Sequence, residues 1–206
     1  MRTEDELIRE VRILAGEHRT RTSMTQHFYS VNSPEGVNAI LRHDPEAFGV
    51  RPDLLPPATT ESVQAAEALV GFRFPPLLIR LWTEVANGGF GPGYGLLGVE
   101  GGFPFDDHGG LTIAENYRSC TTGWPRKLLP ICDWGCFNES AIDCSTPEGG
   151  IVDLPENVIV DMQMTGNDPP PKGMTFAQWM EAWVDGVDLW QYEAKERDEE
   201  DEEEEN

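Results

Sequence analysis

The segment from Thr59 to Gly95 constrains the fold most, because the beginnings and ends of two helices can be read directly from it. Thr60 can cap a first helix, whose apolar residues share one face at Val63, Ala66, Leu69 and Val70. Gly71 supplies the left-handed residue that ends this helix. Pro76 can open a second helix, with a buried stripe at Leu77, Leu78, Leu81, Trp82 and Val85.

Downstream of the sharp turn at Asn87-Gly88-Gly89, the sequence changes from helical to strand-like. Short runs rich in branched or aromatic residues, separated by Gly, Pro, Asn and Asp, predict strands at 94–99, 128–131, 137–143, 150–154 and 158–162. Thr175 and Gln178 form a capping box for a closing helix, with its apolar face at Phe176, Trp179, Met180 and Trp183. Helices followed by strands and a last helix indicate an α+β fold, with an antiparallel twisted sheet of about five strands.

The two ends of the chain differ in composition from the region between them, which we call the body. Residues 4–18 and 33–42 predict helices, so residues 1–50 are interpreted as an N-terminal helical extension that ends at a stiff, proline-rich connector. The body is expected to span residues 56–190. Residues 193–206 hold ten acidic and two basic residues and no aliphatic side chain larger than alanine, so they are predicted to be a disordered acidic tail.

Several short pieces follow the two helices in a fixed order: Tyr94-Gly95-Leu96-Leu97, Leu129-Pro130-Ile131, Trp134-Gly135, Asp143 and Gly150-Ile151-Val152. With the helical segment, this order resembles the SUKH superfamily domain over roughly residues 56–189. That superfamily is known from bacterial toxin-immunity proteins and from a fungal regulator of cell-wall assembly. The resemblance implies an antiparallel sheet backed by helices, and a protein that binds other proteins instead of catalysing a reaction.

A second set of residues is interpreted as structural: Glu67, Gly71, Pro75, Asn87, Gly88, Gly89 and Gly135. Glu67 lies among apolar neighbours on its helix, and its carboxylate is expected to accept hydrogen bonds from the backbone around residues 87–89. The resemblance places Trp134-Gly135 at a structural turn.

The charge of the chain narrows the class of partner. Thirty-seven acidic and fifteen basic residues give a formal net charge of −22, and residues 59–192 alone hold eighteen acids and six bases. Such a field repels phosphate backbones and attracts cationic proteins, so nucleic acid is excluded as a partner and a basic toxin domain, such as a nuclease, is favoured. The alternative is that the acidity serves solubility alone. No apolar run approaches the roughly 20 residues that span a bilayer, and the first residues do not form a secretory signal, so no membrane association and a cytoplasmic location are expected.

The side chains raise two chemical alternatives, a zinc site and a hydrolase that uses a cysteine. Cys120, Cys132, Cys136 and Cys144 raise the alternative of a zinc site, but their spacing lacks paired knuckles, so they are interpreted as small buried hydrophobes without a metal. A hydrolase using a cysteine and His108 is the other alternative. No nucleophile elbow, phosphate-binding loop or metalloprotease helix is present in the sequence, so we expect no enzymatic activity and no cofactor.

The candidate partner-binding residues are acids in or beside turns between predicted strands, together with one tryptophan: Asp106, Asp107, Asp133, Trp134, Glu139 and Asp143. Trp134 is either an exposed apolar anchor of the interface or a buried residue that seals one end of the core, and the high average burial of tryptophan favours the second. The leading hypothesis is an immunity protein that neutralises a cognate toxin. A regulatory or scaffold module without a toxin is the alternative within the class of binding proteins. The sequence leaves open the identity and activity of the partner, the role of residues 1–50 and the oligomeric state.

Overall fold

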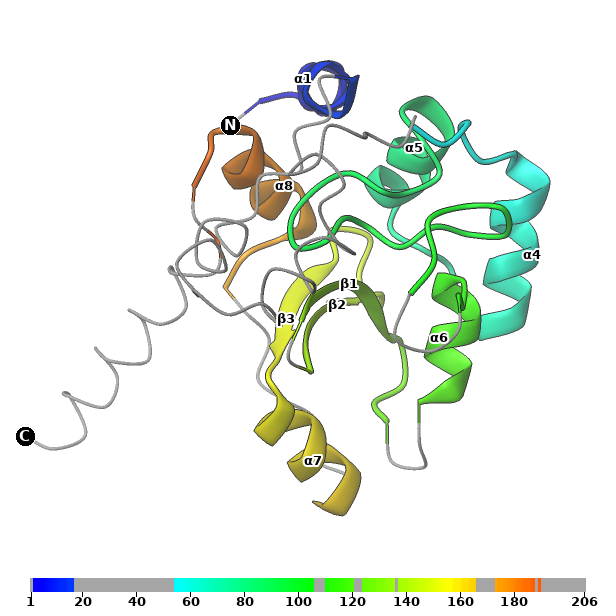
Figure 1. The fold of residues 1–206 in the computed structure, drawn as a ribbon, viewed down its shortest axis with the longest axis vertical. Coiled ribbons are helices and arrows are strands. Elements are labelled where there is room, and N and C mark those ends of the chain that lie inside the picture. Colours follow the sequence, from blue (N-terminus) through cyan, green and yellow to red (C-terminus); the bar gives the residue numbers. More distant parts are fainter. Residues whose placement is uncertain are drawn as a thin grey trace, which may run out of the picture.

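A computed structural model describes residues 2–16, 54–105, 110–120, 124–135, 137–165, 173–187 and 189. In these residues the element order is α1 (Glu4–Gly16), α4 (Thr60–Val70), α5 (Pro76–Glu84), α6 (Ile113–Ser119), β1 (Leu128–Gly135), β2 (Asn138–Asp143), β3 (Gly150–Leu154), α7 (Glu156–Thr165) and α8 (Phe176–Val184). Helices and an antiparallel sheet occur together, which confirms the α+β class (Figure 1). The short helix predicted at 33–42 and the acidic tail lie outside the described residues.

The sheet of the described residues has three strands in the order β1-β2-β3, and not about five. The predicted strand at 94–99 instead runs beside β1 with two backbone hydrogen bonds of 2.8 Å, from Tyr94 N–H to the Asp133 carbonyl and from Leu97 N–H to the Ile131 carbonyl. The strand predicted at 158–162 is wrong, because this segment lies in α7. A short run of apolar residues fits a strand or a buried helix equally well, and the Pro155 carbonyl, which accepts from Val158 and Ile159, favours the helix.

Local signals account for most helix ends. Thr59, and not Thr60, caps α4 by accepting from the Ser62 N–H, and Gly71 ends the helix with a φ of 83°. Pro75 occupies the N-cap position of α5. The capping box of Thr175 and Gln178 is present at the start of α8. Helix α6 has the same box, formed by Thr112 and Glu115, and this helix was not predicted from the sequence.

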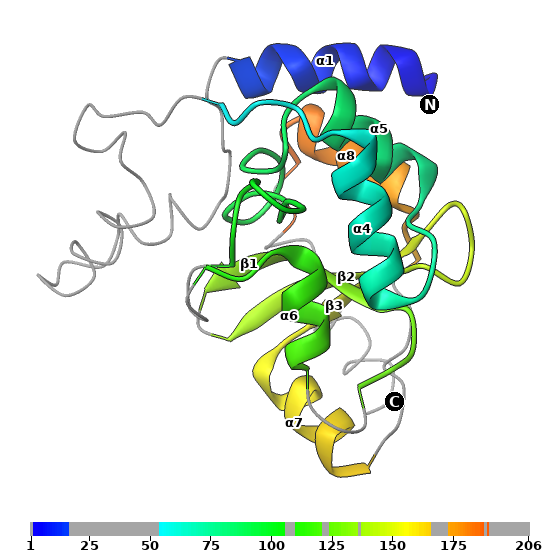
Figure 2. The ribbon, with the colours of Figure 1, turned by 90° about the vertical axis from the view of Figure 1, so that its right-hand side faces the viewer.

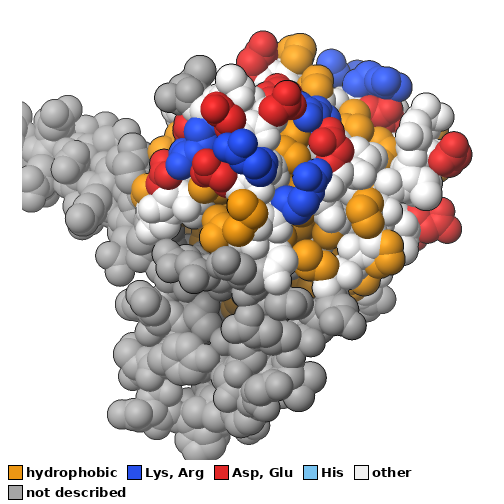
Figure 3. Space-filling model, turned by 90° about the horizontal axis from the view of Figure 1, so that it is seen from above, with side chains coloured by type: hydrophobic (Ala, Val, Ile, Leu, Met, Phe, Trp, Pro, Cys, Tyr) orange, Lys and Arg blue, Asp and Glu red, His pale blue; other side chains and the backbone are white. Residues whose placement is uncertain are grey.

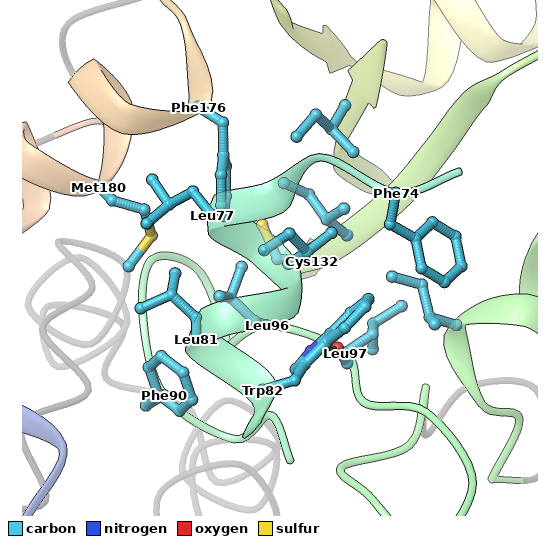
Figure 4. Close-up of a cluster of buried hydrophobic side chains, with 14 of the residues drawn as sticks. Phe74, Leu77, Leu81, Trp82, Phe90, Leu96, Leu97, Cys132, Phe176 and Met180 are labelled. Carbon is cyan, nitrogen blue, oxygen red and sulfur yellow. Dashed lines mark hydrogen bonds between the residues drawn. The ribbon is translucent and has the colours of Figure 1, made fainter. Parts of the chain in front are cut away.

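The core lies between the helices and one face of the sheet. Trp82 on α5 is fully buried, and Figure 4 shows it among side chains from the neighbouring loop, the sheet and α8. Its cluster includes Phe74, Leu81, Leu96, Leu97, Cys132, Phe176 and Met180. A smaller cluster covers the opposite face of the sheet, where Met162 of α7 packs with Leu128, Ala141, Val152 and Leu154.

Helix α1 packs against this same core although a long segment separates it from the body in sequence. Its residues Leu7, Ile8, Val11 and Ala15 are buried in the main cluster, and Figure 2 shows α1 lying across α5 and α8. Arg80 of α5 contacts Asp5 at 2.7 Å and Glu4 at 3.2 Å. Seen from above in Figure 3, basic and acidic side chains lie next to one another on this face.

The glycine-rich turn after α5 is packed around Asn87. The Asn87 side chain accepts from the Val99 N–H at 2.9 Å and donates to the Glu100 carbonyl at 3.1 Å, so it holds residues 98–102 against the end of α5. Gly88 has a φ of 82°, and a Cβ at this position would lie 2.5 Å from the Leu96 carbonyl oxygen. Any larger residue is therefore excluded there. The turn is a packed structural element.

Glu67 is buried and its carboxylate joins α4 to the segment before α5. One oxygen accepts from the Phe74 N–H at 2.9 Å, and the other contacts the Arg73 guanidinium at 2.8 Å. The expected partner around residues 87–89 was therefore wrong. Glu67 and Phe74 are seven positions apart in the sequence, and the bend after Gly71 brings them together.

Candidate interaction surface

The hairpin of β1 and β2 brings two of the predicted partner-binding acids together. Asp133 lies directly opposite Glu139 in the register of the two strands, close to the turn that joins them. Asp143 lies at the other end of β2, opposite Leu128. At about 3.4 Å per residue, the four residues from Glu139 to Asp143 separate these two acids by about 14 Å. The structure therefore forms an acidic pair near the hairpin turn and places Asp143 apart from it.

The carboxylates of Asp133 and Asp143 both accept hydrogen bonds from nearby backbone N–H groups. Asp133 accepts from the Gly135 N–H at 2.7 Å, and Asp143 accepts from the Ser145 N–H at 2.9 Å. Asp133, Glu139 and Asp143 are all half-buried. Because Asp133 and Glu139 lie on directly opposite strand positions, the pair brings two negative charges together at one place, at a cost in mutual repulsion.

Trp134 is not an exposed anchor, because only 4% of its surface is exposed. Its indole N–H donates to the Ser140 hydroxyl at 2.7 Å, and that hydroxyl donates to Asp153 at 2.7 Å. This chain of hydrogen bonds crosses all three strands, from the buried Trp134 and Ser140 to the half-buried Asp153. The favoured interpretation of Trp134 as a buried core residue is therefore confirmed, and its assignment to partner binding is corrected.

Phe137 is the residue that sequence reasoning missed. It lies between Gly135 and the start of β2, its side chain is 73% exposed, and its φ of 61° is a conformation that bulky residues rarely adopt. Solvent-exposed aromatic side chains are enriched in protein interfaces. An aromatic residue inside a predicted turn was the available signal, but the segment 137–143 was interpreted as a strand from its first residue. We refer to Asp133, Phe137 and Glu139 as the hairpin surface.

Four sequence-predicted residues lie outside the described part of the chain: Asp106, Asp107, His108 and Cys136. The two aspartates remain predicted contributors to partner binding. The structural residues Glu67, Gly71, Pro75, Asn87, Gly88, Gly89 and Gly135 are all described. A Cβ on Gly135 would meet the Tyr94 hydroxyl, so this position, like Gly88, is closely packed.

Comparison with protein families decides the affiliation of the chain. The model of the SMI1/KNR4 family (SUKH-1) matches residues 57–182. The chain belongs to this family. Comparison with curated proteins gave no match, and comparison with solved structures gave none either. SUKH-1 domains generally mediate protein–protein interactions and are generally not catalytic, so the chain is a protein-interaction module of the SUKH type.

The match to the SUKH-1 family begins after α1 and ends within α8. It contains both the hairpin surface and the packed turn around Asn87. Helix α1 lies outside the match, yet four of its residues are buried in the same core as those of the SUKH-1 region. In the part of the chain that the structure describes, no helix is long and apolar enough to cross a membrane.

The described cysteines of this SUKH-1 domain are poorly suited to chemistry. Burial raises the pKa of the Cys120 and Cys144 thiols to about 12, with further contributions from Glu139 and Asp143 respectively. Burial also raises the pKa of Cys132 well above its ordinary value. Nucleophilic attack and metal binding both need the thiolate, which these environments disfavour at neutral pH.

Proposed function

We propose that the protein is an immunity protein, which binds a cognate basic toxin of the nuclease type and neutralises it by occupying or distorting its active surface. Membership of the SUKH-1 family supports a protein partner. The excess of eighteen acids over six bases in residues 59–192 supports a cationic partner, because surfaces of opposite charge associate faster and more specifically. As an immunity protein it would act in the cytoplasm.

The observation that carries this proposal is the composition of the hairpin surface. Phe137 provides an exposed apolar group, and the acidic pair of Asp133 and Glu139 lies beside it. An apolar anchor surrounded by charged groups is the usual anatomy of a specific interface, in which the centre excludes water and the rim selects the partner. Asp106, Asp107 and Asp143 are proposed to extend the negative surface toward the partner.

The first experiment identifies the toxin by function. Each gene adjacent to that of this protein is expressed alone and together with it, and growth is measured. We expect one neighbouring product to arrest growth and the full-length protein to restore it by forming a stable complex. If every neighbouring product is harmless, or if none binds, the immunity proposal fails and a regulatory or scaffold module becomes the better interpretation.

A second experiment tests the surface. The variant D133N/E139Q/F137A should lose protection and bind the toxin at least about tenfold more weakly, since one hot-spot side chain is worth about 2 kcal/mol or more. The control E100Q/E148Q removes two exposed acids elsewhere and changes the net charge equally. Equal losses in both variants would mean that only the overall charge matters, and that the hairpin surface is not the interface.

A further inference from the structure

A basic patch interrupts the acidic surface at the end where α4 and α6 lie side by side (Figure 2). Four of the six basic residues between positions 59 and 192 lie here: Arg73, Arg118, Arg126 and Lys127. All four are exposed. We refer to Arg118, Arg126 and Lys127, with the adjacent rings of Phe72 and Tyr117, as the basic patch.

Tyr117 connects the members of this patch. Its ring packs edge-on against Phe72, with 5.2 Å between the ring centroids. Its hydroxyl accepts from the Lys127 N–H at 3.4 Å, and Arg118 follows it in α6. The Arg118 guanidinium in turn donates to the Leu69 carbonyl at the end of α4, at 3.4 Å. These contacts place Arg118 and Lys127 beside one half-buried aromatic pair, and Arg126 directly precedes Lys127 in the chain.

These cations differ from Arg2 and Arg80, which lie on the face of the molecule that includes α1. Arg80 contacts three carboxylates, and Arg2 contacts three as well. Among the described residues, by contrast, no carboxylate lies within ion-pair distance of Arg118, Arg126 or Lys127. Asp143 approaches this end of the sheet, because it lies opposite Leu128, but it does not form such a pair. In a chain with more than twice as many acids as bases, an exposed group of cations without acidic partners is suited to an anionic ligand.

The backbone at Lys127 adds an independent observation. Lys127 has a φ of 68°, which side chains other than glycine adopt only at a cost of about 1–2 kcal/mol. Its carbonyl accepts from the Cys144 N–H at 2.8 Å, so the conformation is held from both sides of the residue. Unfavourable backbone conformations that the surrounding structure holds in place are concentrated at ligand-binding positions.

We propose that the basic patch binds the chain's own acidic segment, residues 193–206. That segment carries ten acids and two bases, which complements three unpaired cations. The excess of acids in residues 59–192 repels a phosphate backbone and this segment alike, but only the segment is tethered to the body and therefore held close to the patch. The inference is independent of the identity of any toxin.

The length of the chain permits this contact. Leu189 is buried in the core, and seventeen residues follow it. An extended chain of that length spans about 56 Å, which exceeds the diameter of about 40 Å expected for a compact domain of this size. Each exposed ion pair is weak, but tethering raises the effective concentration of the segment to the millimolar range. The expected occupancy is that of a minority, salt-sensitive state, which covalent cross-linking can trap.

Zero-length cross-linking of carboxylates to lysines in the full-length protein tests the proposal. The chain has three lysines, Lys127, Lys172 and Lys195, so the cross-linked peptides can be assigned by mass spectrometry. Lys172 is nearer than Lys127 to residues 193–206 in the sequence, so a preference for Lys127 is not expected without the proposed contact. We expect Lys127 to dominate at low salt and its cross-links to decrease at high salt.

Two matched variants make the result specific. R118Q/R126Q should reduce the Lys127 cross-links between about twofold and thirtyfold, the loss expected for two exposed ion pairs. R9Q/R12Q changes the net charge by the same amount, but on α1, and should leave the Lys127 cross-links unchanged. Mixing isotope-labelled and unlabelled protein separates cross-links within one chain from those between chains. Dominance of Lys172, an equal effect of both variants, or cross-links only between chains would each overturn the proposal.

Discussion

The indole N–H of Trp82 donates to the carbonyl oxygen of Leu97 at 2.9 Å, and both residues are buried. Leu97 in turn donates its N–H to Ile131 of β1. Leu97, in the loop after α5, therefore joins helix α5 to the sheet. The family-matched region is held together at this point by a hydrogen bond inside an apolar cluster, where the loss of either partner leaves a buried polar group unsatisfied.

The first prediction compares two buried tryptophans. Trp82→Phe should destabilise the protein by about 1–3 kcal/mol, because the Leu97 carbonyl loses its donor. Trp179 is equally buried, but its indole N–H has no hydrogen-bond partner. Trp179→Phe should therefore cost at least about 1 kcal/mol less. Trp82→Ala, which also leaves a cavity, should cost about 3–5 kcal/mol. Urea denaturation measures all three, and equal costs for the two phenylalanine variants would contradict the prediction.

The second prediction concerns the buried carboxylate of Glu67. Glu67→Ala leaves the Phe74 N–H without its acceptor, so we expect a loss of about 1–3 kcal/mol in the free energy of unfolding. Arg73→Gln should cost less than about 1 kcal/mol, because the Arg73 side chain is 82% exposed. Glu61→Ala, on the exposed side of the same helix, is the control. If Arg73→Gln costs more than Glu67→Ala, the ion pair and not the amide contact holds this junction.

The third prediction tests whether α1 is part of the folded unit. Ile8 is 2% exposed and packs in the main core, whereas Ile13 on the same helix is 54% exposed. Ile8→Ala should lower the free energy of unfolding by about 2–5 kcal/mol, and Ile13→Ala by less than about 0.5 kcal/mol. A single cooperative transition is expected for both variants. A negligible effect of Ile8→Ala would make α1 an independent extension.

The fourth prediction uses the raised pKa of the thiols. Cys120 and Cys144 remain protonated in the folded protein up to a pKa of about 12, whereas an unfolded thiol loses its proton near pH 8.5. The unfolded state therefore binds fewer protons in this interval, and stability should decrease as the pH rises from about 9 to 12. At pH 8, alkylation of both thiols should be much slower in the native protein than in urea. A thiol alkylated at the unfolded rate would revive the alternative of a cysteine hydrolase.

The fifth prediction concerns recognition of the toxin. Association should slow steeply with added salt, because charge steering is screened over about 10 Å at 0.1 M. Neutralising five acids together should weaken binding far more than deleting residues 193–206; the five are Asp106, Asp107, Asp133, Glu139 and Asp143. The tail loses conformational entropy when it is ordered on a partner, which reduces its contribution. If tail deletion abolishes protection while the five substitutions leave it intact, recognition belongs to the tail.

The sequence by itself determined the elements whose signals are local. These elements include α4, which ends at Gly71, α5, which begins at Pro76, strand β3, and α8, which begins with a capping box. Each follows from residues that are close together in the sequence. The order of motifs also indicated the SUKH family, which the match over residues 57–182 confirms. These features need no knowledge of distant contacts, because caps, proline and glycine act on their own backbone.

Only the tertiary structure decided the features that depend on residues far apart in the chain. Residues 158–162 have the composition of a strand but form part of α7, whose Met162 packs with residues of the sheet. Burial of Trp134 was the favoured interpretation of the sequence, but the acceptor of its indole N–H, the Ser140 hydroxyl across the hairpin, is known only from the structure. Phe137, directly after that turn, was left exposed. Burial is a property of the assembled surfaces, so a single sequence predicts which residues can be buried, and packing selects those that are.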